Sequence, residues 1–417
     1  MLLKNVYTSI DIGSDSIKVV VCELHNNKLN LLATSSVKSK GIKKGLIVNA
    51  DDAQASIKEA MEEIESLLGI KINKVIASVP ANNAEFTFIK GEVKIINENN
   101  VVSSDDIVKV LQSSMKAKIT PEKEMVTIIP IDFRLDDAEG MQNPLGHKAS
   151  KLASRAIMVS TPKKNIISVL SVIESMGIEV VDIMINSIGT INALKTREMD
   201  SQVGSIVNIG AETINVALYN KGTIVKNSII PIGSSAIDDN IAKAYNLTLD
   251  KARIVKERFA VCHTKYASKN DFYDVVNKDS KKIRINQAEV SALVSKRYCQ
   301  LLELIVKEIT SLSGKQLDYV MFTGGATNAY RFDMLIKDKL GKKASVGSVT
   351  MVGLRNNQNS AAVGNIIYFI NKLKLKGKEY SMISEEDQDS LSSVNKNTAN
   401  ISSDSMLNKV VGYFFGE

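Results

Sequence analysis

Several residue types are scarce in this 417-residue chain, and each scarcity excludes a class of protein. Three cysteines and three histidines, with no CxxC spacing, support neither a disulfide framework nor a structural zinc site. Six prolines and a charged fraction of 24% argue against a fibrous or wholly disordered chain. No segment reaches the roughly 18 uninterrupted apolar residues of a membrane-spanning helix. The N-terminal stretch MLLKNVYTSIDIG predicts a strand rather than a signal peptide, so we expect a reducing cytoplasm.

The residues that are present predict a globular protein with more than one domain. The chain is 44% hydrophobic and exceeds the roughly 250 to 300 residues at which a single core stops growing. Its net charge is +7, although residues 376–405 hold three lysines against six acids, so the rest of the chain is more basic still. We find no compact Lys/Arg run with interleaved aromatics. We therefore predict no nucleic-acid partner and interpret the charge as solvation and attraction to acidic partners.

One short pattern occurs twice. IDIGSDSIKVVV at residues 10–21 and VNIGAETINVAL at 207–218 both read as strand, glycine turn and strand. Gly13 corresponds to Gly210, and Asp11 to Asn208. Each copy opens its own run of strands and helices, which predicts two related α/β lobes with a shared ligand between them.

Phosphate binding would explain the residue types in both copies. Glycine lets the backbone approach a phosphate, successive N–H groups form an anion-binding nest, and a leading aspartate can hold Mg²⁺ through water. The alternative, a pair of ordinary hairpins with polar turns, stays open. The candidate binding residues are Asp11, Gly13, Ser14, Asp15, Ser16 and Lys18 in the first copy, and Asn208, Gly210, Ala211, Glu212 and Thr213 in the second.

A third glycine pattern, MFTGGATNAYRF at 321–332, joins a short apolar strand to a helix. Such a junction can lie flat against a nucleoside, and Gly324, Gly325 and Ala326 are its candidate residues. A double glycine by itself is weak evidence for a nucleoside site. It supports such a site here because it falls within the second predicted lobe.

In this order the motifs resemble those of the actin-like ATPase superfamily and, within it, the FtsA family of bacterial cell-division proteins. FTGGAT is similar to the superfamily's adenosine motif, and NSAAVG at 359–364 to its second connecting helix. IIPIDFRLDD, NPLGHKASKLASRAIMVST and VIESMGIEVVDIMINSIGTINAL, between residues 121 and 200, are similar to the region in which FtsA replaces the usual actin subdomain. The resemblance implies the α/β class and an actin-like two-lobed fold, with duplicated ribonuclease-H-like lobes around a nucleotide cleft and an FtsA-type inserted subdomain 1C.

The resemblance also implies a division of the chain into six parts. They are subdomain 1A (1–80 and 163–196), subdomain 1C for polymer contacts (81–162), subdomain 2A (197–245 and 319–374), subdomain 2B for docking the FtsZ tail (246–318), a disordered linker (375–405) and a membrane-targeting helix (406–417). The sequence itself supports an amphipathic helix from about Asn286, whose apolar stripe we interpret as core rather than as a docking groove.

The second hairpin departs from the family pattern. An acid and a glycine are expected where this chain has Asn208 and Glu212, and an amide cannot offset the charge of a divalent cation. Lys256 matches a family lysine near the adenosine, whereas Arg253 stands where glutamate is common. We therefore expect ATP or ADP to be held with Mg²⁺, which Asp11 would bind through water, and we expect hydrolysis to be weak or absent. No catalytic residue is assigned.

The C-terminal part predicts a tether with an apolar end. Residues 376–405 have almost no apolar periodicity, and a coil of that length spans about 30 Å. In MLNKVVGYFFGE, residues 406–417, the bulky side chains fall on one helical arc, as in an interfacial membrane anchor. Docking of this peptide on its own body or on a partner remains an alternative. The predicted membrane-contacting residues are Met406, Leu407, Val410, Val411, Tyr413, Phe414 and Phe415.

Three functions are compatible with the sequence. The leading one, which the resemblance implies, is a peripheral membrane adaptor on the cytoplasmic side of the division septum. Such an adaptor forms filaments with itself through subdomain 1C and ties the FtsZ C-terminal tail, and with it other divisome proteins, to membrane lipid. An active ATP-hydrolysing enzyme or chaperone of the same fold, and a PilM-like pilus-assembly scaffold, are the two alternatives.

Overall fold

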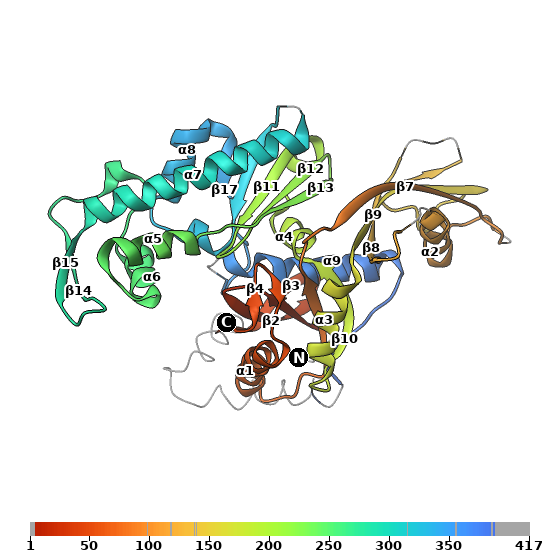
Figure 1. The fold of residues 1–417 in the computed structure, drawn as a ribbon. Helices are drawn as coiled ribbons and strands as arrows, with labels where there is room; N and C mark the ends of the chain where they lie inside the picture. Colours follow the sequence, from red (N-terminus) through yellow and green to blue (C-terminus); the bar gives the residue numbers. More distant parts are fainter. Residues whose placement is uncertain are drawn as a thin grey trace, which may run out of the picture.

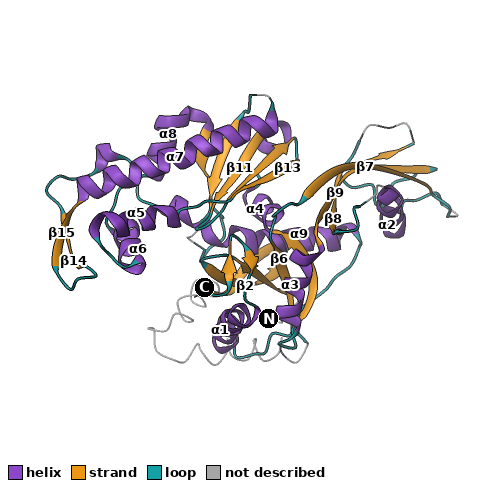
Figure 2. Ribbon diagram, viewed as in Figure 1, coloured by secondary structure: helices purple, strands orange, loops and turns teal. Residues whose placement is uncertain are grey.

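A computed structural model describes residues 5–97, 99–116, 119–136, 138, 140–314, 316–354, 357–384 and 387. Two five-stranded sheets, each with its own helices, form two lobes (Figures 1 and 2). The predicted membrane-targeting helix, 406–417, and residues 385, 386 and 388–405 of the predicted linker lie outside the described residues.

The sheet of the first lobe has the order β3-β2-β1-β6-β10. The pairs β1–β2 and β2–β3 are antiparallel, whereas β6 runs parallel to both β1 and β10. Its strands are β1 (Val6–Ile12), β2 (Ser16–His25), β3 (Lys28–Lys38), β6 (Lys74–Val79) and β10 (Glu179–Ile185).

The sheet of the second lobe repeats this topology in the order β13-β12-β11-β16-β17, with the same antiparallel and parallel pairs. Its strands are β11 (Val203–Ile209), β12 (Ile214–Asn220), β13 (Thr223–Ile230), β16 (Tyr319–Thr323) and β17 (Ala344–Val346). The sequence repeat is therefore a structural repeat, and the predicted pair of related α/β lobes is confirmed.

Alternating side chains give each sheet two apolar faces. In the first lobe, Val19 and Val21 pack in one core with α1 (Ala50–Leu68) and α3 (Lys163–Glu174), while Val20 and Cys22 pack on the other face with α9 (Ser360–Leu375). In the second lobe, α5 (Ser235–Tyr245), α6 (Leu249–Arg258), α7 (Gln287–Ser313) and α8 (Phe332–Leu340) share one core with the sheet. The opposite face of the second-lobe sheet packs against Ile188, Ile191 and Leu194 in another core, so both sheets are covered on both sides.

The amphipathic helix predicted from Asn286 is α7, which begins where the Asn286 side chain accepts hydrogen bonds from two backbone N–H groups and ends at Gly314 in the left-handed conformation. Its stripe is core, as predicted. Val290, Val294, Leu301, Leu302, Ile305 and Ile309 are buried, and Leu293 packs beside them. Before α7 lies a hairpin of β14 (Phe272–Val276) and β15 (Lys282–Asn286).

The segment between β6 and α3 forms a separate three-stranded antiparallel sheet in the order β7-β9-β8. It consists of β7 (Glu85–Lys94), β8 (Lys123–Leu135) and β9 (Lys151–Pro162), with α2 (Ser104–Ser113) packed on it. In Figure 1 this unit projects away from the two lobes. Its bounds agree with the inserted subdomain predicted at 81–162.

The lobes meet where α4 (Asn186–Leu194) packs on α9. A Cβ atom on Gly364 would lie 1.6 Å from the carbonyl oxygen of Gly189, and one on Gly189 would lie 2.2 Å from Asn365 Oδ1. Only glycine permits so close a helix crossing.

Two predicted boundaries need correction. The resemblance assigns 319–374 to the second lobe, but α9 packs on the first-lobe strands because its apolar side chains cover the face of β1, β2 and β6 that is opposite to α1 and α3. The predicted linker also begins too early. Leu375 is still helical, Met382 and Ile383 are buried against the first lobe, and the Met382 N–H donates to the Val6 carbonyl at 2.9 Å.

Candidate functional site

The two glycine turns have the same backbone construction. In the β1–β2 turn the Gly13 N–H donates to the Ser16 carbonyl at 3.2 Å, and in the β11–β12 turn the Gly210 N–H donates to the Thr213 carbonyl at 3.0 Å. A Cβ atom on either glycine would come within about 3 Å of that carbonyl oxygen, at 2.9 and 3.0 Å respectively. Each turn therefore needs its glycine to stay tight.

Both turns line one cavity of about 820 Å³ between the lobes. This volume lies in the range of sites for small molecules and cofactors. Every residue predicted to hold a nucleotide is among the lining residues, namely Asp11, Gly13, Ser14, Asp15, Ser16, Lys18, Asn208, Gly210, Ala211, Glu212, Thr213, Lys256, Gly324, Gly325 and Ala326. The structure thus brings the whole predicted set together around one cavity.

The double glycine lies at the end of β16, against the second turn. Gly324 has φ +93°, and a Cβ atom there would lie 2.3 Å from Asn208 Oδ1. Gly325 would meet nothing within 4 Å, so it presents bare backbone to open space. A one-turn 3₁₀ helix, Gly325–Asn328, follows before α8. This arrangement fits a flat group lying against the backbone.

Two charged side chains, Asp11 and Lys18, lie on β1 and β2 next to the first turn. Asp11 Oδ1 accepts from the Ser78 hydroxyl at 2.8 Å, and Asp11 Oδ2 lies 3.5 Å from Lys18 Nζ. Ser78 Oγ in turn accepts from the Ile12 N–H at 3.2 Å. Asp11 and Lys18 are both 8% exposed. The carboxylate is therefore held in a fixed orientation at the cavity wall.

The equivalent positions below the second turn are neutral. Asn208 pairs in the hairpin register with Asn215, as Asp11 does with Lys18. Thr323 lies beside Asn208 in the parallel register, but its Oγ1 and Asn215 Nδ2 lack hydrogen-bond partners among the described residues. Asn208 Nδ2 donates to Thr190 Oγ1 at 3.4 Å. Asn208 and Asn215 therefore give the cavity amides where the first lobe has a carboxylate and an ammonium group.

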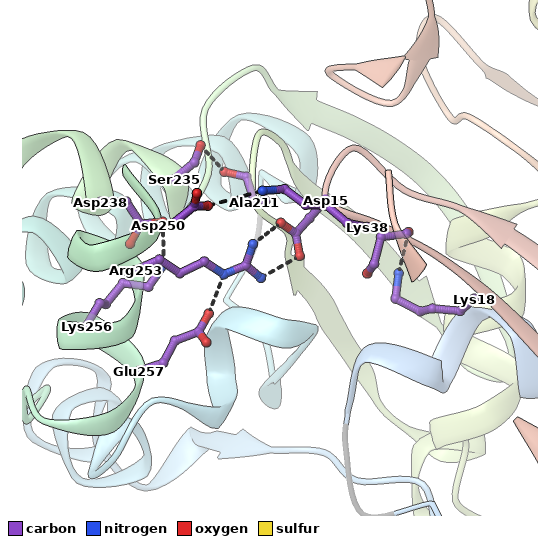
Figure 3. A network of polar contacts seen from close by, with 11 residues as sticks. Asp15, Lys18, Lys38, Ala211, Ser235, Asp238, Asp250, Arg253, Lys256 and Glu257 are labelled. Carbon is purple, nitrogen blue, oxygen red and sulfur yellow. Dashed lines mark hydrogen bonds and ion pairs between the residues drawn. The ribbon is translucent and has the colours of Figure 1, made fainter. Parts of the chain in front are cut away.

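A buried ion pair closes the side of the cavity formed by α5 and α6 (Figure 3). Lys256 Nζ donates to Asp238 Oδ2 at 2.8 Å, and both residues are nearly inaccessible to water. Burial raises the pKa of Asp238, and the charge of Lys256 and its hydrogen bond only partly offset this rise. Lys256 thus lines the cavity, but it already has a partner within its own lobe.

Polar contacts also cross the cavity from lobe to lobe. Arg253 on α6 donates to both oxygens of Asp15 at 2.5 and 2.7 Å, as Figure 3 shows. Glu212 accepts from the Lys44 N–H at 2.6 Å, so this side chain faces the first lobe. Lys38 and Asp250 form an exposed pair at 3.1 Å.

Sequence reasoning missed several residues of this site. Ser78 and Asp238 belong to no motif, and Lys44 contributes only its backbone N–H. One signal was available for Ser78, because β6 holds the place in its sheet that β16 holds in the other, and this aligns Ser78 with Thr323 of the glycine motif.

Taken together, a duplicated sheet, two glycine turns and an interlobe cavity define an actin-like fold. Solved structures agree with this class. MreB5 of Spiroplasma citri bound to ADP matches with a TM-score of 0.51 and 13% identity over 90% of this chain and 99% of that chain. A PilM–PilN type IV pilus biogenesis complex matches with a TM-score of 0.58 and 13% identity over 88% of this chain and 99% of that chain.

Sequence comparisons identify the family. The model "Cell division protein FtsA" matches residues 205–364, and "SHS2 domain inserted in FTSA" matches 83–160, which together make up more than half of the chain. FtsA of Bacillus subtilis is 24% identical over 90% of this chain and 86% of that relative, and FtsA of Streptococcus pneumoniae is 25% identical over 85% and 78%. The chain belongs to the FtsA family of cell-division proteins.

No helix in the described part of the chain combines the length and the apolar character needed to cross a membrane. In the same part, no three side chains of His, Cys, Asp or Glu gather in a way that could hold a metal ion.

Proposed function

We propose that this FtsA-family chain is a cytoplasmic adaptor of cell division that polymerises and tethers FtsZ filaments to the inner face of the membrane, with a nucleotide held between its lobes. Family membership, which includes the match to the inserted subdomain, is the observation that supports this role most strongly. The cavity supports the nucleotide, because two equivalent turns point their backbones at it from opposite lobes.

The lining residues suit a nucleotide in most respects. Glycine turns can hold phosphates by backbone N–H groups, and the open face at Gly325 leaves room for a flat base. Asp11 would hold Mg²⁺ through water, and the cation would neutralise phosphate charge. MreB5 structures of this fold, one bound to ADP and one to AMPPNP, support a nucleotide as the ligand.

Weak hydrolysis follows from the second turn. Asn208 gives the cavity an amide where a carboxylate would help to orient a cation or a water molecule. A neutral amide still accepts and donates hydrogen bonds, so binding can persist while turnover is lost. We therefore favour a nucleotide-holding scaffold over an ATP-hydrolysing enzyme or chaperone.

Calorimetric titration with ATP and Mg²⁺ tests the nucleotide proposal. The wild-type protein should bind ATP, and Asn208→Asp should strengthen the Mg²⁺-dependent part of binding by about tenfold, because it adds a charge beside the cation. Glu212 is the other residue that departs from the family pattern, and Glu212→Gly, made alone, is its matched control. An absence of binding heat in both the wild type and Asn208→Asp would refute a nucleotide site here.

The membrane role rests on the sequence of residues 406–417. Each large apolar side chain that is fully buried contributes about 1.5 to 3 kcal/mol, so one short helix binds lipid reversibly and polymerisation adds avidity. Full-length protein should float with phosphatidylglycerol-containing liposomes, whereas the 1–405 truncation should stay in solution. Equal flotation of both would remove the anchor from the proposal.

Partner binding separates the adaptor from a PilM-like scaffold of the same fold. We assign FtsZ-tail docking to residues 246–318 and self-assembly to residues 81–162. Co-sedimentation with FtsZ filaments should recover the full-length protein, and removal of the FtsZ C-terminal tail should abolish the recovery. Recovery that does not depend on that tail would contradict the assignment.

A further inference from the structure

Asp15 and Glu212 occupy the same position in the two copies of the repeat, one residue beyond the middle of each glycine turn. Each side chain reaches out of its own lobe to a partner in the other. An acid at this position works against phosphate binding, because two like charges 4 Å apart repel by about 4 kcal/mol at an effective dielectric of 20. The two acids therefore call for another explanation than ligand binding.

The first contact joins the β1–β2 turn to α6. Arg253 holds Asp15 through two parallel hydrogen bonds, the geometry in which arginine binds a carboxylate most strongly. Glu257, one turn further along α6, accepts from Arg253 Nε at 2.9 Å and so fixes the guanidinium in place. Burial works against the ionised form of Asp15, but the hydrogen bonds and charge of Arg253 prevail and lower its pKa below the ordinary value.

The second contact joins the β11–β12 turn to the short hairpin of β4 (Ile42–Lys43) and β5 (Leu46–Ile47). Both turn residues of this hairpin have positive φ, +49° at Lys44 and +77° at Gly45, as in a type I′ turn. The Lys44 N–H donates to Glu212, and the Gly45 N–H donates to Ser14 Oγ at 2.7 Å. The hairpin thus touches both glycine turns at once.

The two contacts are separate from the crossing that connects the lobes, since none of their residues belongs to α4 or α9. The start of each crossing helix, at Asn186 and Ala361, lines the same cavity as the two turns. Contacts between the turns and the opposite lobe therefore join the lobes at points additional to the α4–α9 crossing.

We propose that Asp15 with Arg253, and Glu212 with the Lys44 N–H, form a reciprocal clamp that holds the two lobes closed without a ligand. In a protein whose lobes close only on a nucleotide, the ligand supplies the cross-link. Here side chains of the chain itself supply it, so lobe closure no longer reports whether the cavity is filled. This clamp is independent of nucleotide binding, so lobe closure must be measured in the ligand-free protein.

Distance measurements between spin labels test the clamp. Labels at Glu59→Cys on α1 and Asn270→Cys in the second lobe, both exposed positions, are placed in a Cys299→Ser background, and double electron–electron resonance is recorded without nucleotide. The unchanged clamp should give one narrow distance distribution. Arg253→Glu places like charges face to face, and the share of molecules at the wild-type distance should fall by about threefold or more.

Reversal of both charges distinguishes the clamp from a general structural role of Arg253. The double variant Asp15→Arg with Arg253→Glu should restore the narrow distribution, and Arg253→Lys should restore it in part. Lys38→Gln removes the exposed pair across the rim and should leave the distances unchanged, because so exposed a pair contributes little. A wild-type distribution in Arg253→Glu, or no restoration in the double reversal, would overturn the proposal.

Discussion

The β1–β2 turn and the β11–β12 turn share a backbone but differ in charge. Each is closed by one glycine N–H to a carbonyl two residues past the turn centre, and each faces the same cavity. Below the first lie Asp11, Lys18 and Ser78, joined by polar contacts, and below the second lie Asn208 and Asn215, which carry no charge. Both members of the charged pair are replaced together, so neither change leaves a buried charge alone.

This difference separates two tasks that a phosphate site combines. Both turns have backbone N–H groups that can hold an anion. Only the first hairpin has a carboxylate, Asp11, at the position that can bind a cation, because the second has Asn208 there. Retention of the turn geometry with loss of one acid is what we expect of a site that holds a ligand without rapid chemistry. The asymmetry lies in the side chains and not in the fold.

The largest effect should come from breaking the crossing that holds the two turns opposite each other. Gly364→Ala places a methyl group where the Gly189 carbonyl already lies, so α4 and α9 must move apart. We expect a loss of about 3 kcal/mol in the free energy of unfolding, measured by urea titration. Gly325→Ala, whose added Cβ meets nothing within 4 Å, is the control and should change stability by less than about 0.5 kcal/mol.

Next in size, the first turn can be made to resemble the second. Asp11→Asn leaves Lys18, only 8% exposed, without its counter-charge and should cost about 2 kcal/mol of stability. Adding Lys18→Asn reproduces the neutral pair of the second lobe and should recover about half of that loss. If the double variant is no more stable than Asp11→Asn, the two positions are not coupled as the comparison requires.

A smaller pair of changes compares the hydroxyl groups beside each turn. Ser78→Ala removes hydrogen bonds to both Asp11 and the Ile12 N–H and should cost about 1 to 2 kcal/mol. Thr323→Val should be nearly neutral, because Thr323 Oγ1 has no hydrogen-bond partner among the described residues. Thermal unfolding of the two variants side by side measures the difference, and equal losses would show that the two lobes are supported alike.

The smallest expected effect is a pH dependence confined to the first turn. The pKa of Asp15 is lower in the folded protein than in the unfolded chain, so its stabilising contribution is present above the ordinary carboxyl pKa and disappears as pH falls through the lowered value. Asp15→Asn should therefore lose less stability than the wild type between about pH 5 and pH 3. Because the side chains of Arg253 and Asp15 are 38% and 34% exposed, water screens the pair and the difference should not exceed about 1 kcal/mol. Urea titrations at several pH values provide the measurement, and parallel curves for the two proteins would contradict it.

Much of the fold could be predicted because the repeat is local. Strand, glycine and strand are encoded within a dozen residues, and two such copies predict two related lobes. The side of α9 could not be predicted in this way. Its sequence is apolar nearly all round, and only the face of the first-lobe sheet opposite to α1 and α3 decides where it packs.

The site divides along the same line. The lining residues were predictable because glycine turns carry their own signal, whereas the partners of Glu212 and Asp15 were not. From the sequence alone, an acid in either turn only weakens the case for a phosphate site. Its partner in the opposite lobe lies 168 residues away for Glu212 and 238 residues away for Asp15. Long-range pairs between single residues leave no periodic pattern in a sequence.

Phosphate release from ATP, compared between the wild type and Asn208→Asp in the presence and absence of Mg²⁺, measures whether the second turn supports hydrolysis. We expect the wild type to bind ATP yet to release phosphate no faster with Mg²⁺ than without it, and we expect Asn208→Asp to gain Mg²⁺-dependent release. Brisk Mg²⁺-dependent release by the wild type would contradict this expectation, because an amide at position 208 would then suffice for hydrolysis.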